Sequence, residues 1–317
     1  QRWSLGFQRQ LAAGILVEAG YLGNRGTRLQ IARDINTIPG SALSTSPERD
    51  QRTIDFLNQS FSNPFFGLDP VFTRNISRSQ LARPYPEFGN LQVTEPIGYS
   101  WYHALEIRAE RRFAAGFTFQ TAYTWSKAME ATEFLNSFET APYRTVSSFD
   151  RPKRWAFSGI YELPFGKSRR FLGGWQLNAL IQHQSGAPLD FGNLIFRGNI
   201  RDIALPSDQR SVDRWINVDA GFERASARQL ASNVRTFPLR FASVRGDGQM
   251  KWDLSAIKYF RLTERAKVQF RAEAYNALNH PNFENPATNN VTVSGFGQVS
   301  NVAGTARQFQ FAVKVTF

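Results

Sequence analysis

The last eleven residues of the sequence, RQFQFAVKVTF (307–317), alternate strictly between two kinds of side chain. Polar or small residues separate the apolar positions, which are Phe309, Phe311, Val313, Val315 and Phe317. Successive side chains of a β-strand point to opposite faces, so a period of two gathers the apolar residues on one face. The stretch therefore predicts a strand with one apolar and one polar face.

Eight further segments show the same period of two. They lie near residues 3–7, 15–22, 99–108, 117–126, 155–163, 175–182, 251–256 and 268–275. Several approach the roughly 9–11 residues that a tilted strand needs to cross a bilayer. The sequence thus predicts an all-β fold with about nine antiparallel strands.

The connections between these segments alternate between short and long. Short turns are expected near residues 9–14, 111–116, 164–170 and 261–267. The long connections are about 75 residues between the second and third strands, then 127–152, 185–250 and 277–306. Outer-membrane barrels have short periplasmic turns and long extracellular loops. This pattern favours a transmembrane β-barrel over the alternative, a soluble all-β protein with half-buried strands.

The two faces of the predicted strands differ in composition. Aromatic residues near the strand ends fit the girdles of a membrane barrel, and the girdle is predicted to contain Tyr99, Trp101, Tyr123, Trp125, Trp155, Trp175 and Trp252. Further side chains expected to face lipid are Leu105, Ile107, Phe119, Phe157, Leu177 and Phe270. The opposite face should line a wet lumen with Gln120, Gln182 and the charged residues Glu106, Arg108, Glu110, Arg271 and Glu273.

The sequence has 317 residues, a formal charge of +12 and no cysteine. Its basic residues do not form one patch, which argues against a nucleic-acid partner. Nine of them fall in the predicted short turns, where Glu264 is the sole acid: Arg9, Arg111, Arg112, Lys167, Arg169, Arg170, Arg261, Arg265 and Lys267. At the periplasmic rim these side chains could hold their charge at anionic lipid phosphates.

Catalytic and metal-binding patterns find little support. The three histidines, His103, His183 and His280, are scattered, and His103 lies on an apolar strand face. Ser255 and Lys258 have the S-x-x-K spacing of penicillin-binding enzymes, but on a strand these two side chains face opposite sides. We therefore expect neither an enzyme nor a cofactor or metal site.

The predicted number of strands is odd, whereas bacterial single-chain barrels have an even number. We therefore expect residues 1–317 to be the C-terminal part of one larger barrel domain. The last strand would be an unpaired edge until such a barrel closes. It could then be recognised by strand addition, so Phe309, Phe311, Val313, Val315 and Phe317 are a predicted assembly signal.

Several longer strings resemble one family of barrels. YTWSKAME (123–130), DRPKRWAFSGIYELPFGK (150–167), FLGGWQLNALIQHQSGAP (171–188) and VQFRAEAYNALNHPNF (268–283) resemble the barrel of Oar-like TonB-dependent receptors. NPFFGL (63–68) and RPYPEFGN (83–90) resemble loops of that family. The resemblance implies a barrel of about 22 strands with an N-terminal plug and often an N-terminal carboxypeptidase-regulatory-like β-sandwich. Neither the plug nor the sandwich is present in these residues.

The family resemblance implies TonB-dependent uptake of an unidentified substrate across the bacterial outer membrane. The expected partners are the lipid bilayer, the TonB complex through the absent N-terminal part, the outer-membrane assembly machinery and the substrate. A passive porin, a surface adhesin or structural barrel, and a soluble basic β-protein are the alternatives. The sequence assigns no residue to a ligand.

Overall fold

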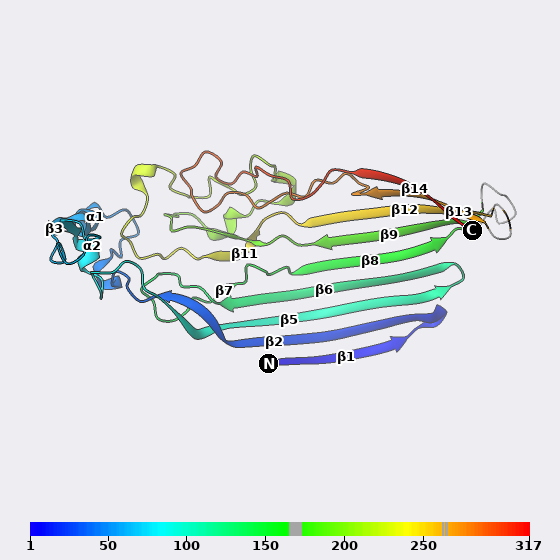
Figure 1. The fold of residues 1–317 in the computed structure, drawn as a ribbon, viewed down its shortest axis with the longest axis horizontal. Coiled ribbons are helices and arrows are strands. Elements are labelled where there is room, and N and C mark those ends of the chain that lie inside the picture. The colour runs from blue at the N-terminus through cyan, green and yellow to red at the C-terminus, as the bar shows by residue number, and fades with distance from the viewer. Residues whose placement is uncertain (165–172, 262, 264–265) are drawn as a thin grey trace.

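The computed structural model describes residues 1–164, 173–261, 263 and 266–317. Its main element is an antiparallel sheet whose strands follow one another in the order β1-β2-β5-β6-β8-β9-β12-β13-β14 (Figure 1). These strands are β1 (Arg2–Gln10), β2 (Ile15–Asp34), β5 (Gln92–Ala114), β6 (Phe117–Ala131), β8 (Lys153–Glu162), β9 (Trp175–Gln184), β12 (Gln249–Arg261), β13 (Lys267–Tyr275) and β14 (Gln308–Thr316). The prediction of an all-β sheet with about nine strands is confirmed.

The remaining elements belong to the connections. They are α1 (Gln51–Asn58), β3 (Ser60–Ser62), β4 (Asn75–Ser77), α2 (Arg78–Leu81), β7 (Thr145–Val146), β10 (Pro188–Asp190) and β11 (Arg240–Arg245). Five short 3₁₀ segments are Ala12–Gly14, Gly40–Ala42, Ile200–Ile203, Ser207–Gln209 and Ser226–Arg228. None of the helices in the described part of the chain is long and apolar enough to cross a bilayer.

The connections alternate in length as predicted. The turn between β5 and β6 consists of Ala115 and Gly116, whose φ angles of 53° and 79° are both positive. This combination is typical of the tight hairpin turn that matches the twist of paired strands. The long connections, residues 35–91, 132–152, 185–248 and 276–307, gather at the opposite end of the sheet (Figure 1).

Several strands extend further than the alternation predicted. β2 was expected to end near Leu22 but runs to Asp34, where it still pairs with Gln92 of β5. The extension contains glycine and charged residues, and its register shifts between Thr27 and Ile31. Ile31 is buried and packs with Leu29 beside Gly98, but the register shifts interrupt the period of two, so a search for alternation misses this part of the strand.

The predicted turns at 9–14 and 111–116 are shorter than expected, whereas the connection between β8 and β9 is longer than the predicted 164–170. Of the nine basic residues assigned to the short turns, Arg9, Arg111, Arg112, Arg261 and Lys267 lie in the ends of strands rather than in the turns. Lys167, Arg169, Arg170 and Arg265, together with Glu264, lie outside the described residues.

The largest hydrophobic core of the described residues lies in the long connections, not between the strands. It consists of Leu189, Phe191, Leu194, Ile203, Trp215, Ile216, Phe222, Phe237, Val244, Val291 and Phe296. These residues come from the connections 185–248 and 276–307, which we call the cap. The long connections are therefore partly folded into a compact layer at one end of the sheet.

Candidate functional site: two faces of the sheet and a folded cap

Strand register places the side chains of the sheet on two faces. Leu105 lies opposite Tyr21 and Trp125, whereas its neighbour Glu106 lies opposite Gly20 and Thr124. Residues directly opposite in an antiparallel pair share a face. Leu105 and Glu106 thus belong to different faces, which we call the aromatic face and the polar face.

The aromatic face contains all the side chains expected to contact lipid. Following the register from β1 to β14, it includes Trp3, Trp101, Leu105, Ile107, Phe119, Tyr123, Trp125, Trp155, Phe157, Leu177, Trp252, Phe270, Phe309, Phe311, Val313 and Val315. Phe317 lies one residue beyond the end of β14 and is almost fully exposed.

Six of the seven residues predicted for the girdle fall near opposite ends of the strands. Trp175 lies at the start of β9, beside the short connections. Tyr123 lies near the middle of β6, and the other five lie nearer the long connections: Tyr99, Trp101, Trp125, Trp155 and Trp252. Polar partners satisfy two of the indoles, since Trp155 donates to Thr121 Oγ1 at 2.8 Å and Trp252 donates to His183 Nε2 at 3.0 Å.

A second aromatic cluster was not predicted from the sequence. His103 Nδ1 lies 2.6 Å from the Tyr21 hydroxyl, and the two rings stack with centroids 6.0 Å apart. Trp3 meets the same histidine edge-on and lies flat over Gly23, where a Cβ atom would come within 2.2 Å of the indole. The glycine makes room for the indole, a contact that alternation cannot reveal.

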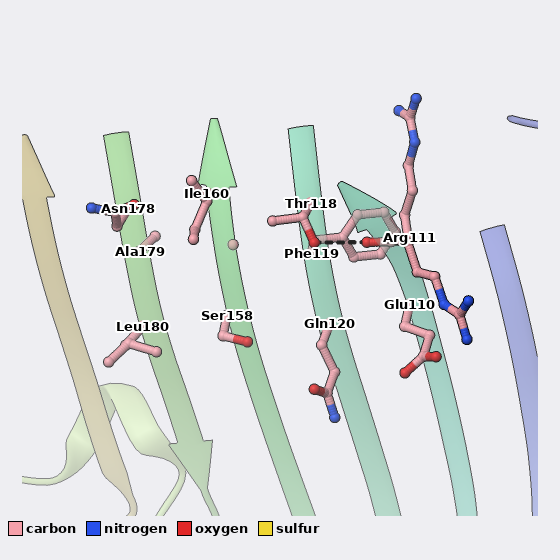
Figure 2. Close-up of a pocket in the computed structure, with 12 residues that line it drawn as sticks. Glu110, Arg111, Thr118, Phe119, Gln120, Ser158, Ile160, Asn178, Ala179 and Leu180 are labelled. Carbon is pink, nitrogen blue, oxygen red and sulfur yellow. Dashed lines mark hydrogen bonds between the residues drawn. The ribbon is translucent and has the colours of Figure 1, made fainter. Parts of the chain in front are cut away.

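The polar face forms an open hollow of about 480 Å³ near the short connections (Figure 2). Glu110, Gln120, Ser158 and Asn178 line it from four adjacent strands. Asn178 Nδ2 also donates to Ser255 Oγ of β12 at 2.8 Å, which continues the polar surface across the sheet. Ile160 and Leu180 line the hollow as well, so its wall combines polar and apolar side chains.

The five charges predicted for the lumen all lie on the polar face by register. Arg108 and Glu110 are two residues apart on β5, with Nη2 and Oε2 2.6 Å apart. Arg271 and Glu273 form a similar pair on β13 at 3.5 Å. Glu106 lies on the same face opposite Gly20 and Thr124. Two ion pairs thus run along single strands and remain partly exposed.

An ionic cluster centred on a buried arginine attaches the cap to the sheet. The guanidinium of Arg240 on β11 binds Glu130 of β6 at 3.1 Å, Glu133 at 2.6 Å and Asp190 of β10 at 2.8 Å. It also donates to the carbonyl of Val146 in β7 at 3.0 Å, and its side chain is only 3% exposed. One arginine therefore joins segments from three long stretches of the chain.

The cap also extends over the polar face near its outer end. Glu130, which holds Arg240, lies on the polar face opposite Ser100. A hollow of about 260 Å³ separates polar-face residues such as Arg154 and Lys251 from the connection at 303–305. A solute that approaches the polar face from this end would therefore meet the cap first.

Catalytic chemistry is not apparent in the described part of the chain. Within it, no three histidine, cysteine or acidic side chains gather to hold a metal ion. Ser255 faces Asn178 on the polar face, whereas Lys258 lies opposite Trp175 and Phe270 on the aromatic face. The separation predicted for the S-x-x-K pair is confirmed.

A family model described as "Outer membrane beta barrel domain" matches residues 1–310. The chain belongs to this family. The chain, which we call the barrel domain, is therefore part of a protein of the bacterial outer membrane, as the alternation of its strands and connections predicted. No curated protein matches the chain.

Solved structures similar to the barrel domain include the outer membrane transporter YddB from Escherichia coli. It is 9% identical with a TM-score of 0.47, and the match covers 99% of this chain and 32% of that chain. The ferripyoverdine receptor of the outer membrane of Pseudomonas aeruginosa is 10% identical with a TM-score of 0.43, covering 99% and 26% respectively. The barrel domain thus spans a third or less of the length of either chain.

Proposed function

We propose that the barrel domain is part of an Oar-like, TonB-dependent receptor that takes up a substrate through a plugged barrel. The observation that supports this most strongly is the folded cap, anchored by Arg240 and extended over the end of the polar face. A receptor needs an ordered outer surface that selects its substrate before passage. The sequence strings quoted above support the TonB-dependent subtype.

In this proposal the aromatic face contacts lipid and the polar face lines the lumen. Apolar side chains gain nothing from burial against protein when lipid already surrounds them, and this would account for the exposure of Leu105 and Trp125 on interior strands of the sheet. The long connections would face the outside and the short ones the periplasm. Phe309, Phe311, Val313, Val315 and Phe317 would then serve the assembly machinery as a recognisable strand.

We propose further that additional strands close the barrel. In the described residues β1 and β14 each pair with one neighbouring strand, at the two edges of the sheet (Figure 1). Open edges of this kind are not tolerated in lipid, because unpaired backbone groups there cost several kcal/mol each. Residues outside this chain would supply the missing strands, the plug and the segment that contacts TonB.

The polar-face ion pairs would position the plug in this proposal. Arg108 and Arg271 already have carboxylate partners two residues away, and both pairs are partly exposed. Such pairs contribute roughly 0–1 kcal/mol to stability. They are therefore free to exchange partners with a plug surface at little energetic cost.

Two measurements on the full-length protein test this function. The first is ion conductance in a planar bilayer, where a plugged receptor should conduct weakly and a porin should conduct steadily. The second is direct binding to the purified periplasmic domain of TonB, which only the receptor should show. Steady conductance together with no TonB binding would overturn the proposal in favour of a passive porin. Weak conductance without TonB binding would overturn it in favour of an adhesin or structural barrel.

A further inference from the structure

Four cations lie together on the aromatic face, next to the long connections. Arg25 is opposite Trp101, Lys127 is opposite His103, and Lys153 is opposite Trp125. Three adjacent rows of the register therefore hold a cation each. Lys127 and Lys153 are diagonal neighbours on the paired strands β6 and β8, about 7–8 Å apart and close enough for long side chains to act together. Arg25 lies on β2, across β5 from Lys127.

The fourth cation comes from a connection. The guanidinium of Arg144 lies 4.4 Å from the centroid of the Trp101 ring. Because Trp101 belongs to the aromatic face, this stacking places Arg144 on the same side as the other three cations. Arg25, Arg144 and Lys153 are exposed, and the Lys127 side chain is 44% exposed.

Few carboxylates oppose this cluster. The aromatic-face positions of its three rows contain no aspartate or glutamate. Asp150 lies 3.9 Å from Lys127, but it is fully buried and its carboxylate is bound by Arg245 at 2.5 Å. Asp247 lines a hollow of about 370 Å³ together with Lys153, and its carboxylate accepts the Phe283 amide at 2.9 Å. The cluster keeps a net positive charge.

The cluster lies among the outer rings of the aromatic belt, because Trp101 and Trp125 share rows with Arg25 and Lys153. Tyr123 and Trp155 come one row nearer the short connections than Lys153 and Trp125. Aromatic belts mark the depth at which acyl chains give way to headgroups. Long basic side chains at that depth lay their stems along apolar surface and hold their charges among the headgroups.

We infer that Arg25, Lys127, Arg144 and Lys153 form a binding surface for the phosphate groups of anionic lipids in the outer leaflet. Charge complementarity identifies the partner: four cations at headgroup depth face no free carboxylate, and phosphate is the anion that lipids place there. The inference rests on the orientation of the two faces proposed above, but not on TonB or on transport.

The test compares lipid binding by full-length protein in a neutral detergent, measured by native mass spectrometry. The probes are bisphosphorylated lipid A and the same lipid after removal of both phosphates. The wild type should bind the phosphorylated form more tightly. In the double variant Lys127→Gln/Lys153→Gln this preference should fall about thirtyfold, because each of the two basic residues near an anionic headgroup contributes about 1 kcal/mol.

Matched variants separate this effect from misfolding. Arg154 and Lys251 lie at the same end of the sheet but on the polar face, so Arg154→Gln/Lys251→Gln should keep the preference. The charge-conserving Lys127→Arg/Lys153→Arg should keep it as well. Equal binding of the two lipids by the wild type, an equal loss in the polar-face control, or displacement by inorganic phosphate at the same concentration would overturn the inference.

Discussion

Large apolar side chains are exposed on the strands of the sheet but buried in the cap. On interior strands, Leu105 and Trp125 are 39% and 59% exposed, whereas in the cap Phe191 and Phe222 are 2% and 9% exposed. A water-soluble protein buries its large apolar residues in the regular elements and leaves its loops polar. Here the regular elements expose them and the loops bury them. The solvent next to each region explains the difference, since lipid surrounds the strands and water surrounds the cap.

The cap should therefore respond to core mutations as a soluble domain does. Phe222 packs against Phe191, Phe196, Phe237 and Phe296. Phe222→Ala should destabilise the cap by about 3–5 kcal/mol, because it removes a buried ring and leaves a cavity. Urea titration of the full-length protein in detergent, followed by proteolysis within residues 185–248, measures this.

Phe311→Ala is the matched control on the aromatic face. It removes an equal volume from a side chain that detergent or lipid contacts, so the solvent fills the space and the urea midpoint should change much less. Equal losses in Phe222→Ala and Phe311→Ala would mean that the two regions do not differ in the way described.

The attachment of the cap to the sheet can be broken separately from its core. Arg240→Met keeps the apolar stem but leaves Glu130, Glu133 and Asp190 without their shared cation. Glu133 and Asp190 are 45% and 53% exposed and can be solvated, so the main cost is the loss of donors to the buried Glu130 and to the Val146 carbonyl. We expect a loss of about 1–3 kcal/mol in the stability of the cap, with protease cleavage between β10 and β11. Arg228→Met is the control, because that side chain is 73% exposed and should change the cleavage rate little. Similar rates in the two variants would exclude an anchoring role.

A smaller effect is expected where residues 35–91 meet the cap. Asp50 caps α1 by accepting the amides of Arg52 and Thr53. The hydroxyl of Ser44, the hydroxyl and amide of Thr53 and the amide of Arg52 hold the pKa of Asp50 below its ordinary value of 3.8. Because the folded pKa is lowered, the stabilising contribution is complete above that ordinary value and is lost as the pH falls through the folded pKa.

Hydrogen exchange of residues 51–58 in the full-length protein tests this prediction. After correction for intrinsic exchange, protection should stay constant from neutral pH to about pH 4 and then fall. Asp50→Asn should keep the helix capped but remove this fall, since asparagine also caps helices and does not titrate there. A variant with the same acid profile as the wild type would show that another group controls α1.

The sequence predicted the strands well because lipid exposure imposes a strict period of two. The alternation of 99–108 and 117–126 marks two strands because every second residue meets the same solvent. The same rule missed the outer half of β2, which lies beyond the aromatic belt and pairs through its backbone.

The cap was missed because its core has no period. Leu189, Phe222 and Phe296 meet in space from distant parts of two connections. The density of apolar residues in stretches such as FGNLIF (191–196) was the available indication that the long connections are folded. The convergence of Arg240 on three carboxylates had no sequence pattern at all, because its partners are 50 to 110 residues away.

The central claim is that the two faces of the sheet meet different solvents, and two adjacent residues test it most directly. The chain has no cysteine, so Leu105→Cys and Glu106→Cys each introduce one thiol into it, one per face. In full-length protein within intact outer membranes, a lipid-soluble maleimide should label Leu105→Cys and a charged, membrane-impermeant maleimide should label Glu106→Cys. Labelling of Leu105→Cys by the charged reagent, together with protection of Glu106→Cys, would contradict the orientation of the faces.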